Sequence, residues 1–337
     1  MIQLSIVIVN YKTPSLVIDC LATIERETSG IDYEVIVVDN DSGDCSGDLV
    51  LKAFPSVRWI DMGYNAGFAR ANNAGIRLSN GGIVLLLNPD TLIEDRAISG
   101  CYELLSASSY IACGVQLLNP DRSPQISGNF FMKGGLNYLL PLPYLGPLVK
   151  GVGGLLRVAT PHVPDAGALV EVDWVNGAYL MVKREAIDLG GLLDEDFFLY
   201  AEEAEWCSRL RRLGKICIYG QFHVVHLEGA SANSTFGAEG KGYYDLYDRK
   251  GLQIMLSNFV RIRKQFGIGW FLVQMCFYWL DIPVFGAGLL LSGLTRGGGN
   301  GRRYSWAMLR GFCWNVGYIT ARSGTIIRNK PYFYKVL

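Results

Sequence analysis

Asp90 follows a short, fully apolar run and is the carboxylate that the sequence places best for chemistry. The run Ile83–Leu87 has β-branched residues first, which is typical of a strand buried on both faces of a parallel sheet. Pro89 cannot donate to a sheet, so Asp90 should lie at the carboxyl edge, where open α/β sheets bind ligands. A carboxylate there suits a divalent cation that carries a diphosphate. The alternative is a turn in which Asp90 caps a helix that begins near Glu94.

The ends of the first two predicted strands differ in what they could bind. The first strand, at 4–9, leads into residues 10–14 without a glycine, which disfavours a dinucleotide cofactor because backbone cannot approach a pyrophosphate there. Asp39 follows the second strand, at 33–38, and from that position a carboxylate can accept hydrogen bonds from a nucleoside. A solvated polar turn over 39–44 is the alternative.

Three glutamates, Glu202, Glu203 and Glu205, crowd the first turn of a predicted helix. The helix dipole favours anions at this end, and Glu205 and Arg209 have the i,i+4 spacing of an ion pair. Adjacent carboxylates also repel one another, and one that points into a cleft would serve as a general base. Two interpretations therefore stay open, a charged helix terminus and a catalytic base.

The composition argues against several classes of protein. The net charge is zero, with 31 Lys and Arg against 31 Asp and Glu, so nothing indicates nucleic-acid binding. The eight cysteines include no C-x-x-C pair, which predicts free thiols in a reducing cytoplasm and no zinc site. The N-terminus lacks a basic region and is expected to be a first strand rather than a signal peptide. His223 and His226 follow a predicted strand at 216–219 and are either ligands or structural residues.

Strands and helices alternate with short connections across the first 118 residues, which predicts a doubly wound, mostly parallel α/β sheet flanked by helices. Residues 119–170 are rich in Gly and Pro and are expected to form a flexible insertion. Strands should resume at 170–173 and 179–182, joined by 174–178. The predicted elements of the first part are strands at 4–9, 33–38, 57–60 and 83–88 and helices at 14–26, 65–78 and 94–105.

The last hundred residues read as a hydrophobic, helical region. Residues 268–294 are mostly apolar, with Asp281 as their only charge and Pro283 close behind, and basic residues flank the segment on both sides. A membrane-spanning helix needs about 20 apolar residues, and a break at 281–283 leaves neither half long enough. We expect a shallow hairpin or interfacial helices on an anionic membrane surface. The alternative is a helical subdomain that packs on the rest of the chain or forms a homo-oligomer.

Six short motifs occur in order along the chain: Ile8-Val9-Asn10-Tyr11, Val38-Asp39-Asn40-Asp41-Ser42, Asn65-Ala66-Gly67-Phe68-Ala69-Arg70-Ala71-Asn72-Asn73, Leu87-Asn88-Pro89-Asp90-Thr91, Trp174-Val175-Asn176-Gly177-Ala178 and Tyr200-Ala201-Glu202-Glu203. Together they resemble glycosyltransferase family 2, in its rhamnosyltransferase- and galactofuranosyltransferase-like branch. The resemblance covers residues 3–235 and implies a GT-A fold. The implied catalytic domain is 1–236, with a nucleotide-sugar half at 1–118 and an acceptor half at 170–236. The region 237–337 would then associate with a membrane or oligomerise.

The resemblance implies an inverting transfer from a nucleotide sugar, with site residues in each half. Asp39 would contact the nucleoside, and the segment 9–11 would line the base. The residues implied for nucleotide-sugar binding are Val9, Asn10, Tyr11, Asp39, Asn40, Ser42, Asn65, Gly67, Arg70, Asn73, Asn88 and Asp90. Those implied for acceptor binding are Trp174, Asn176, Gly177, Ala178 and Glu202.

The resemblance also implies a cation site and a base. Asp90 fills the last position of the family's D-x-D-type metal motif, Asn88 stands where the first Asp often lies, and His226 resembles a further ligand of Mg²⁺ or Mn²⁺. The second acid of the family's E-D motif is the catalytic base, and this chain has Glu203 there instead of Asp. Either of the two other glutamates of that turn remains an alternative base.

The implied reaction moves a sugar to a saccharide acceptor in cell-surface polysaccharide biosynthesis. The first candidate donor is dTDP-rhamnose, with UDP-linked sugars as alternatives, and the expected acceptor is linked to a polyprenyl diphosphate. We expect the protein at the cytoplasmic face of the plasma (inner) membrane, as a peripheral or monotopic protein. The competing interpretations are a catalytically inactive relative that acts as a partner protein and a nucleotidyltransferase.

Overall fold

A computed structural model describes the chain at residues 2–158, 161–227, 246–295 and 304–336. The described residues form two compact units, each with its own core. The expected boundary at 236–237 lies outside the described residues. The first unit contains residues 2–130, 162–198 and 202–227, and the second contains residues 131–158, 161, 199–201, 246–295 and 304–336.

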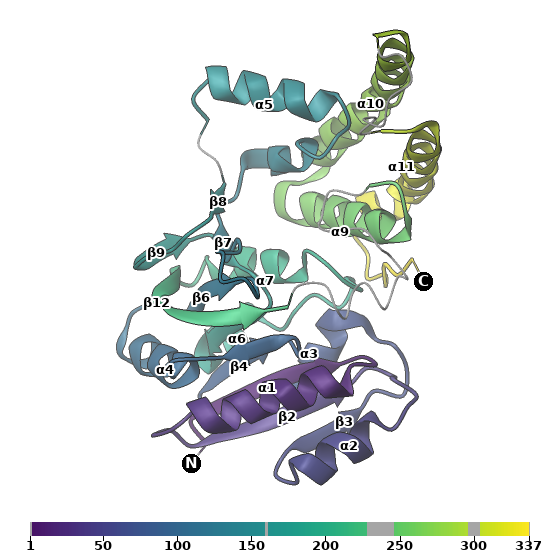
Figure 1. The fold of residues 1–337 in the computed structure, drawn as a ribbon. Helices are drawn as coiled ribbons and strands as arrows, with labels where there is room; N and C mark the ends of the chain where they lie inside the picture. The colour runs from purple at the N-terminus through teal and green to yellow at the C-terminus, as the bar shows by residue number, and fades with distance from the viewer. Residues whose placement is uncertain (1, 159–160, 228–245, 296–303, 337) are drawn as a thin grey trace. The chain divides into compact units, whose positions relative to one another are not determined.

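The first unit is built on a nine-stranded sheet with helices on its faces (Figure 1). The strand order is β3-β2-β1-β4-β11-β6-β12-β5, and β9 pairs with β12. The strands are β1 (Leu4–Asn10), β2 (Tyr33–Asp39), β3 (Arg58–Asp61), β4 (Ile83–Leu87), β5 (Thr91–Ile93), β6 (Ala112–Leu118), β9 (Leu169–Val172), β11 (Tyr179–Lys183) and β12 (Ile216–His226). A small second sheet joins β7 (Gly128–Asn129), β8 (His162–Val163) and β10 (Trp174–Val175). The helices are α1 (Pro14–Glu27), α2 (Ser46–Ala53), α3 (Gly67–Leu78), α4 (Ala97–Ala107), α6 (Arg184–Gly190) and α7 (Glu202–Leu210).

The strands β3, β2, β1 and β4 run parallel, so their carboxyl ends meet at one edge of the sheet. Asn10 lies opposite Asp39, and Ile8 lies opposite Leu87. The α/β class is confirmed, but the sheet as a whole is mixed, because β11 runs antiparallel between β4 and β6. Strand β11 therefore starts at the edge of the sheet where β4 ends, and the loop that precedes β11 lies at this edge.

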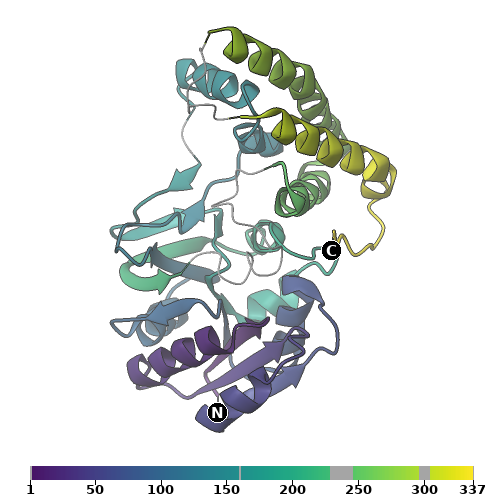
Figure 2. The same cartoon turned by 45° about the vertical axis from the view of Figure 1, so that its right-hand side comes forward.

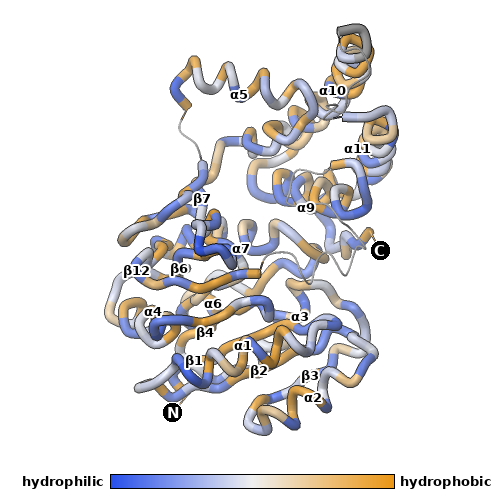
Figure 3. Tube along the Cα trace, viewed as in Figure 1, coloured by the Kyte–Doolittle hydropathy of each residue, from blue (hydrophilic) through white to orange (hydrophobic). Residues whose placement is uncertain are grey.

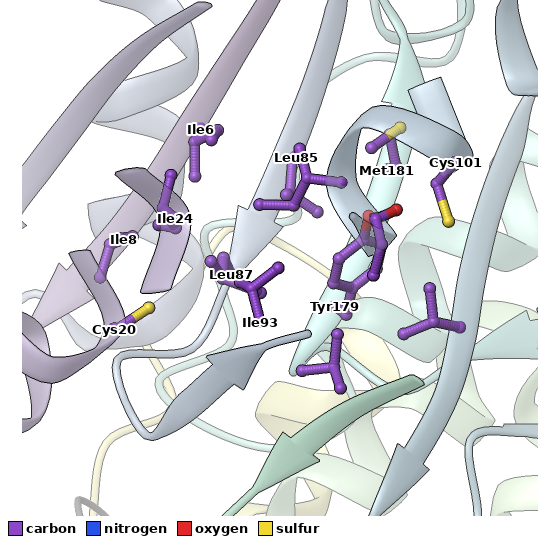
Figure 4. Packing of buried hydrophobic residues seen from close by; sticks show 14 of the residues in the cluster. Ile6, Ile8, Cys20, Ile24, Leu85, Leu87, Ile93, Cys101, Tyr179 and Met181 are labelled. Atoms are coloured by element: carbon purple, nitrogen blue, oxygen red, sulfur yellow. Dashed lines mark hydrogen bonds between the residues drawn. The ribbon is translucent and has the colours of Figure 1, made fainter. Parts of the chain in front are cut away.

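Alternating residues of the strands build one core beneath α1 and α4. Every second residue of β1 and of β4 belongs to this buried cluster, which is typical of strands covered by helices (Figure 4). Tyr179 and Met181 continue the same layer on β11. The cluster fixes the register of the strands and hence the positions of their ends.

The segment expected to be a flexible insertion contains regular structure. Residues 131–158 belong to the second unit, where they form a 3₁₀ helix, η1 (Lys133–Leu139), and α5 (Leu145–Leu155). The other helices of this unit are α9 (Arg249–Phe266), α10 (Ile268–Thr295) and α11 (Trp306–Arg328). Helices α10 and α11 pack side by side (Figure 2).

Helix α10 is continuous through Pro283, so the predicted break at this residue does not occur. A proline removes one helical hydrogen bond, and the packing of α10 against α9, α11 and η1 compensates for it. Aromatic rings supply that packing: Phe259 of α9 meets Phe271 and Tyr278 of α10, and Phe285 meets Phe312 of α11. By length and composition, Ile268–Ser292 could also cross a membrane.

Candidate active site

Asp39 is held in a buried network at the ends of β1 and β2. Its Oδ1 accepts hydrogen bonds from Asn10 Nδ2 at 2.7 Å and from Ser42 Oγ at 2.6 Å, and its Oδ2 accepts one from the Ser42 backbone N–H at 2.9 Å. Asn10 Nδ2 also lies 3.0 Å from Ser42 Oγ. The three predicted residues are thus brought together, and the carboxylate is fixed with acceptor capacity to spare.

The next two predicted residues shape the loop that precedes α3. Asn40 Oδ1 accepts from the Ala66 N–H at 2.8 Å, and Asn65 Oδ1 accepts from the Gly67 N–H at 3.2 Å. Gly67 has φ of +74°, and a Cβ there would lie 2.2 Å from the carbonyl oxygen of Phe198. Only glycine fits this position, because both the backbone conformation and the space exclude a side chain.

Arg70 and Asn73 form hydrogen bonds with the backbone of the segment that leads toward α7. Asn73 exchanges two bonds with the backbone of Leu193, at 2.9 and 3.0 Å, and Arg70 Nε donates to the Glu195 carbonyl at 3.0 Å. Asn73 is fully buried, so the geometry gives it a positioning role. A direct role of Arg70 in nucleotide-sugar binding stays a prediction.

Val9 and Tyr11 were expected to line a nucleobase. Val9 is buried in β1, and Tyr11 is half-buried just beyond the strand, where Lys12 Nζ lies 5.3 Å from its ring centroid. Of these two side chains, Tyr11 is therefore the one with exposed surface that a nucleobase could contact. This contact stays a prediction.

Asp90 and His226 approach each other at the carboxyl edge of the sheet. The chain continues from Asp90 into β5 and α4 begins only at Ala97, so Asp90 does not cap this helix. His226, the last residue of β12, lies opposite Thr91. Its Nε2 is 3.4 Å from Asp90 Oδ1 and 3.5 Å from Asn88 Nδ2. His223 lies earlier in β12.

The side chains around Asp90 fit a divalent cation whose remaining ligands a substrate would supply. Asp90 Oδ1 is buried and accepts no hydrogen bond from the described residues, which is costly for a carboxylate unless a further partner arrives. Within the described residues, no three His, Cys, Asp or Glu side chains form a ready cation cage. The pair Asp90 and His226 would hold a Mg²⁺ or Mn²⁺ ion whose other ligands are substrate oxygens and water, as Mg²⁺ commonly does at phosphates.

Gln125 orients His226 and was not found by sequence reasoning. Gln125 Oε1 lies 2.9 Å from His226 Nδ1, and Gln125 Nε2 donates to the His226 carbonyl at 2.7 Å. Since the amide oxygen can only accept, Nδ1 carries a proton, and in the neutral imidazole the lone pair is therefore on Nε2, the nitrogen nearest Asp90 and Asn88. No sequence signal marks Gln125, which lies in the Gly- and Pro-rich segment, because its role depends on a contact 101 residues away.

The three glutamates of α7 have different environments. Glu205 forms an ion pair with Arg209 at 2.9 Å, and Arg209 also donates to the carbonyls of Gly190 and Leu192. Glu205 therefore has a structural role, as the i,i+4 spacing predicted. Glu202 is buried, whereas Glu203 is half-buried at the start of the helix.

The loop between β10 and β11 connects Asn88 with Glu203. The Asn88 N–H donates to the Ala178 carbonyl at 3.0 Å, and Asn176 Oδ1 accepts from the Ala178 N–H at 2.9 Å. A Cβ on Gly177 would lie 3.6 Å from Cβ and Cγ of Glu203. The loop thus contacts Asn88 at one end and the predicted base at the other, and Trp174 is half-buried in β10.

Comparisons with known proteins identify the sequences and structures to which this chain is similar. Residues 5–143 match the family model described as glycosyl transferase family 2. The low-salt glycan biosynthesis hexosyltransferase Agl10 of Haloferax volcanii is 32% identical over 220 residues, which are 62% of this chain and 62% of that protein. The N-acetylglucosaminyl-diphospho-decaprenol L-rhamnosyltransferase of Mycobacterium tuberculosis is 25% identical, over 62% of this chain and 73% of its own length.

A solved structure with the same fold covers most of the chain. It is the mannosyltransferase PcManGT from Pyrobaculum calidifontis in complex with GDP-Man and Mn²⁺, with a TM-score of 0.54 and 15% identity. The match covers 98% of this chain and 81% of the mannosyltransferase. At this identity the similarity establishes the fold alone.

Proposed function

We propose, from the premise that residues 5–143 form a glycosyltransferase family 2 domain, that this chain transfers a hexosyl group from a nucleotide sugar to an acceptor hydroxyl. The observation that carries the proposal is the buried Asp90 Oδ1, which accepts no hydrogen bond from the residues that the structure describes and lies 3.4 Å from His226 Nε2 at the carboxyl edge of the sheet. The printed names of the two relatives, a hexosyltransferase and a rhamnosyltransferase, support the same class of reaction.

On the donor side, the proposed roles follow the geometry. Asp39, fixed by Asn10 and Ser42, accepts hydrogen bonds from the nucleoside. Asp90 and His226 hold a divalent cation, Mg²⁺ or Mn²⁺, and a bound cation would neutralise charge on the diphosphate leaving group. The buried position of Asp90 excludes water from this carboxylate and strengthens its interaction with a cation.

On the acceptor side, Glu203 is the proposed base. Its carboxylate removes the proton of the acceptor hydroxyl while that oxygen forms a bond to the anomeric carbon. The bond from this carbon to the diphosphate breaks, and the diphosphate leaves with the electron pair. One base on the face opposite the leaving group is sufficient for an inverting transfer. Trp174 and the loop from Asn176 to Ala178 would position the acceptor, together with Glu202.

We further propose dTDP-rhamnose as the first donor to test, with UDP-linked sugars next, and a polyprenyl-diphosphate-linked saccharide as the acceptor. The name of the Mycobacterium tuberculosis relative contains both a diphospho-decaprenol and a rhamnosyl group, which supports this choice. Such an acceptor would place the reaction at the cytoplasmic face of the plasma (inner) membrane.

The test is a transfer assay with each donor, Mn²⁺ and a polyprenyl-diphosphate-linked N-acetylglucosamine. Mass spectrometry would measure the sugar added to the acceptor. We expect a gain of one deoxyhexose or hexose that EDTA abolishes and excess Mn²⁺ restores. Release of sugar 1-phosphate, with the donor's diphosphate bond cut and the nucleoside monophosphate transferred to an acceptor, would instead indicate nucleotidyl chemistry and contradict the proposal.

A further inference from the structure

Helix α10 carries its polar groups on the face that packs against the rest of the second unit. Gln274 Nε2 donates to the carbonyls of Gly134 and Gly135 at 3.0 and 2.8 Å, and Tyr278 Oη donates to the Tyr138 carbonyl at 3.0 Å. Asp281, the helix's single charged residue, is fully buried. A helix on the surface of a water-soluble protein has the reverse arrangement, with polar residues outward.

The outward face of α10 is apolar from Ile268 to Leu291, within the part of the helix whose side chains the structure describes. Its exposed residues recur every three or four positions, and none of them is charged. The hydrogen-bonding side chains among them are the indole of Trp279 and the thiol of Cys276. The exposed residues are Ile268, Gly269, Leu272, Val273, Cys276, Trp279, Leu280, Pro283, Val284, Ala287, Leu290 and Leu291. At 1.5 Å per residue this stripe is about 34 Å long, and Figure 3 shows hydrophobic residues along the helix. Exposed apolar surfaces of this extent mark interaction sites.

The charge of the surrounding chain indicates what covers this face. Residues 246–337 contain thirteen Lys and Arg and two Asp, a net charge of +11 in a chain that is neutral overall. Helix α11, which packs beside α10, exposes Trp306 and Trp314 together with Arg310 and Arg328. Tryptophan and arginine at an apolar boundary are typical of the interface between lipid headgroups and hydrocarbon.

We infer that the outward face of α10 inserts into the surface of an anionic bilayer, with the helix parallel to the membrane plane and α11 at the level of the headgroups. A second copy of the chain is a poorer occupant, since two regions of charge +11 repel each other. A spanning orientation is also disfavoured, because the polar face of α10 is bonded to η1 and packs against α9, whose Arg261 and Arg263 would be drawn into hydrocarbon.

The inference rests on the second unit alone and is independent of the proposed transfer. Flotation of the full-length chain with vesicles of phosphatidylglycerol and phosphatidylcholine tests it. The variant carries Leu272→Glu, Leu280→Glu and Leu291→Glu, all at exposed positions of α10. The matched control carries Leu49→Glu, Leu78→Glu and Leu189→Glu, which are exposed in the first unit and add the same charge.

We expect the wild type and the control to float with anionic vesicles, and the bound fraction of the α10 variant to fall at least tenfold. Circular dichroism should show unchanged folding of both variants, and calorimetric nucleotide binding should be the same in all three proteins. Equal flotation of the α10 variant and the wild type would overturn the inference. The inference would also be overturned if the wild type did not float with vesicles but formed a dimer, measured by light scattering, that the α10 variant did not form.

Discussion

At the scale of single residues, Gln125 decides which nitrogen of His226 is available. Its amide nitrogen donates to the His226 carbonyl and to Asn119 Oδ1 at 2.8 Å, which fixes the amide oxygen toward Nδ1. Without that acceptor the imidazole can take the other tautomer and present an N–H to Asp90. A proton at Nε2 would exclude a cation from the position between the two side chains.

Gln125→Leu should therefore weaken Mn²⁺-dependent nucleotide binding by about 10- to 100-fold. Binding measured in EDTA should stay unchanged, since the nucleoside contacts lie at Asp39. Gln125→Glu keeps an acceptor for Nδ1–H and should restore most of the metal-dependent affinity. Equal losses for the two variants, in calorimetric titrations with and without Mn²⁺, would assign Gln125 a purely structural role.

Glu203 and Glu205 share one helical turn and are predicted to respond differently to the same substitution. Glu203→Gln removes the proposed base and should lower the transfer rate by about 10²- to 10⁴-fold with unchanged nucleotide affinity. Glu205→Gln breaks the ion pair with Arg209 and should lower the thermal midpoint with little direct effect on the rate. Near-normal turnover by Glu203→Gln would show that the base is another residue.

At the scale of elements, the start of α3 depends on one glycine. Gly67→Ala would place a methyl group against the Phe198 carbonyl, and the backbone on both sides would have to move. We expect a loss of more than about 3 kcal/mol in the free energy of unfolding. Gly63→Ala is the matched control, since its φ is +68° but no atom of the described residues lies within 4 Å of a Cβ there, and it should cost about 1–2 kcal/mol. Equal urea midpoints for the two variants would contradict this account.

The buried Asp281 makes the stability of the second unit depend on pH. Burial raises the pKa of Asp281 to about 7, and the Leu145 backbone N–H partly offsets this rise. Between about pH 4 and 7 the native carboxyl keeps a proton that the unfolded chain has lost, so the free energy of unfolding falls as pH increases. At pH 8, Asp281→Asn should be more stable than the wild type by up to about 4 kcal/mol, because the pKa difference is about 3 units, and the two should converge near pH 4. Parallel stability profiles of the two proteins would contradict the assignment.

The sequence predicted the elements whose hydrophobic pattern is locally complete. Strands β1, β2 and β4 and helices α1 and α3 begin and end within about two residues of their predicted bounds, because periodicity and turn residues mark them. The antiparallel insertion of β11 was not predictable, since it depends on pairings between distant strands. The break at Pro283 was wrong because tertiary packing overrides a local helix breaker.

The candidate site was predictable where residues follow strand ends. Asp39 and Asp90 each terminate a buried strand, so their common edge could be inferred from the order of the elements. The ion pair of Glu205 with Arg209 needed the structure, because sequence spacing alone fits both a base and an ion pair, and the role of Glu203 as base stays a prediction. The positioning roles of Asn73 and Gln125 depend on partners more than 100 residues away.

At the scale of the whole molecule, the first 245 residues and the last 92 residues of the chain carry opposite charge. Residues 246–337 have a net charge of +11, so the preceding 245 residues have a net charge of −11. The acidic part holds the proposed nucleotide-sugar site, where a cation would offset the charge of a diphosphate. The basic part contains α10 and suits an anionic membrane surface. We therefore expect mutations in one part to weaken nucleotide binding without changing membrane binding, and mutations in the other part to do the reverse.

The most direct test of the central claim is calorimetric titration of the full chain with dTDP, UDP and GDP, each in Mn²⁺ and in EDTA. We expect one nucleotide to bind at least tenfold more tightly in Mn²⁺ than in EDTA. Asp90→Ala should lose this gain while its weaker binding in EDTA changes little. Absence of binding by all three nucleotides to a folded protein would contradict the account and favour a catalytically inactive partner protein.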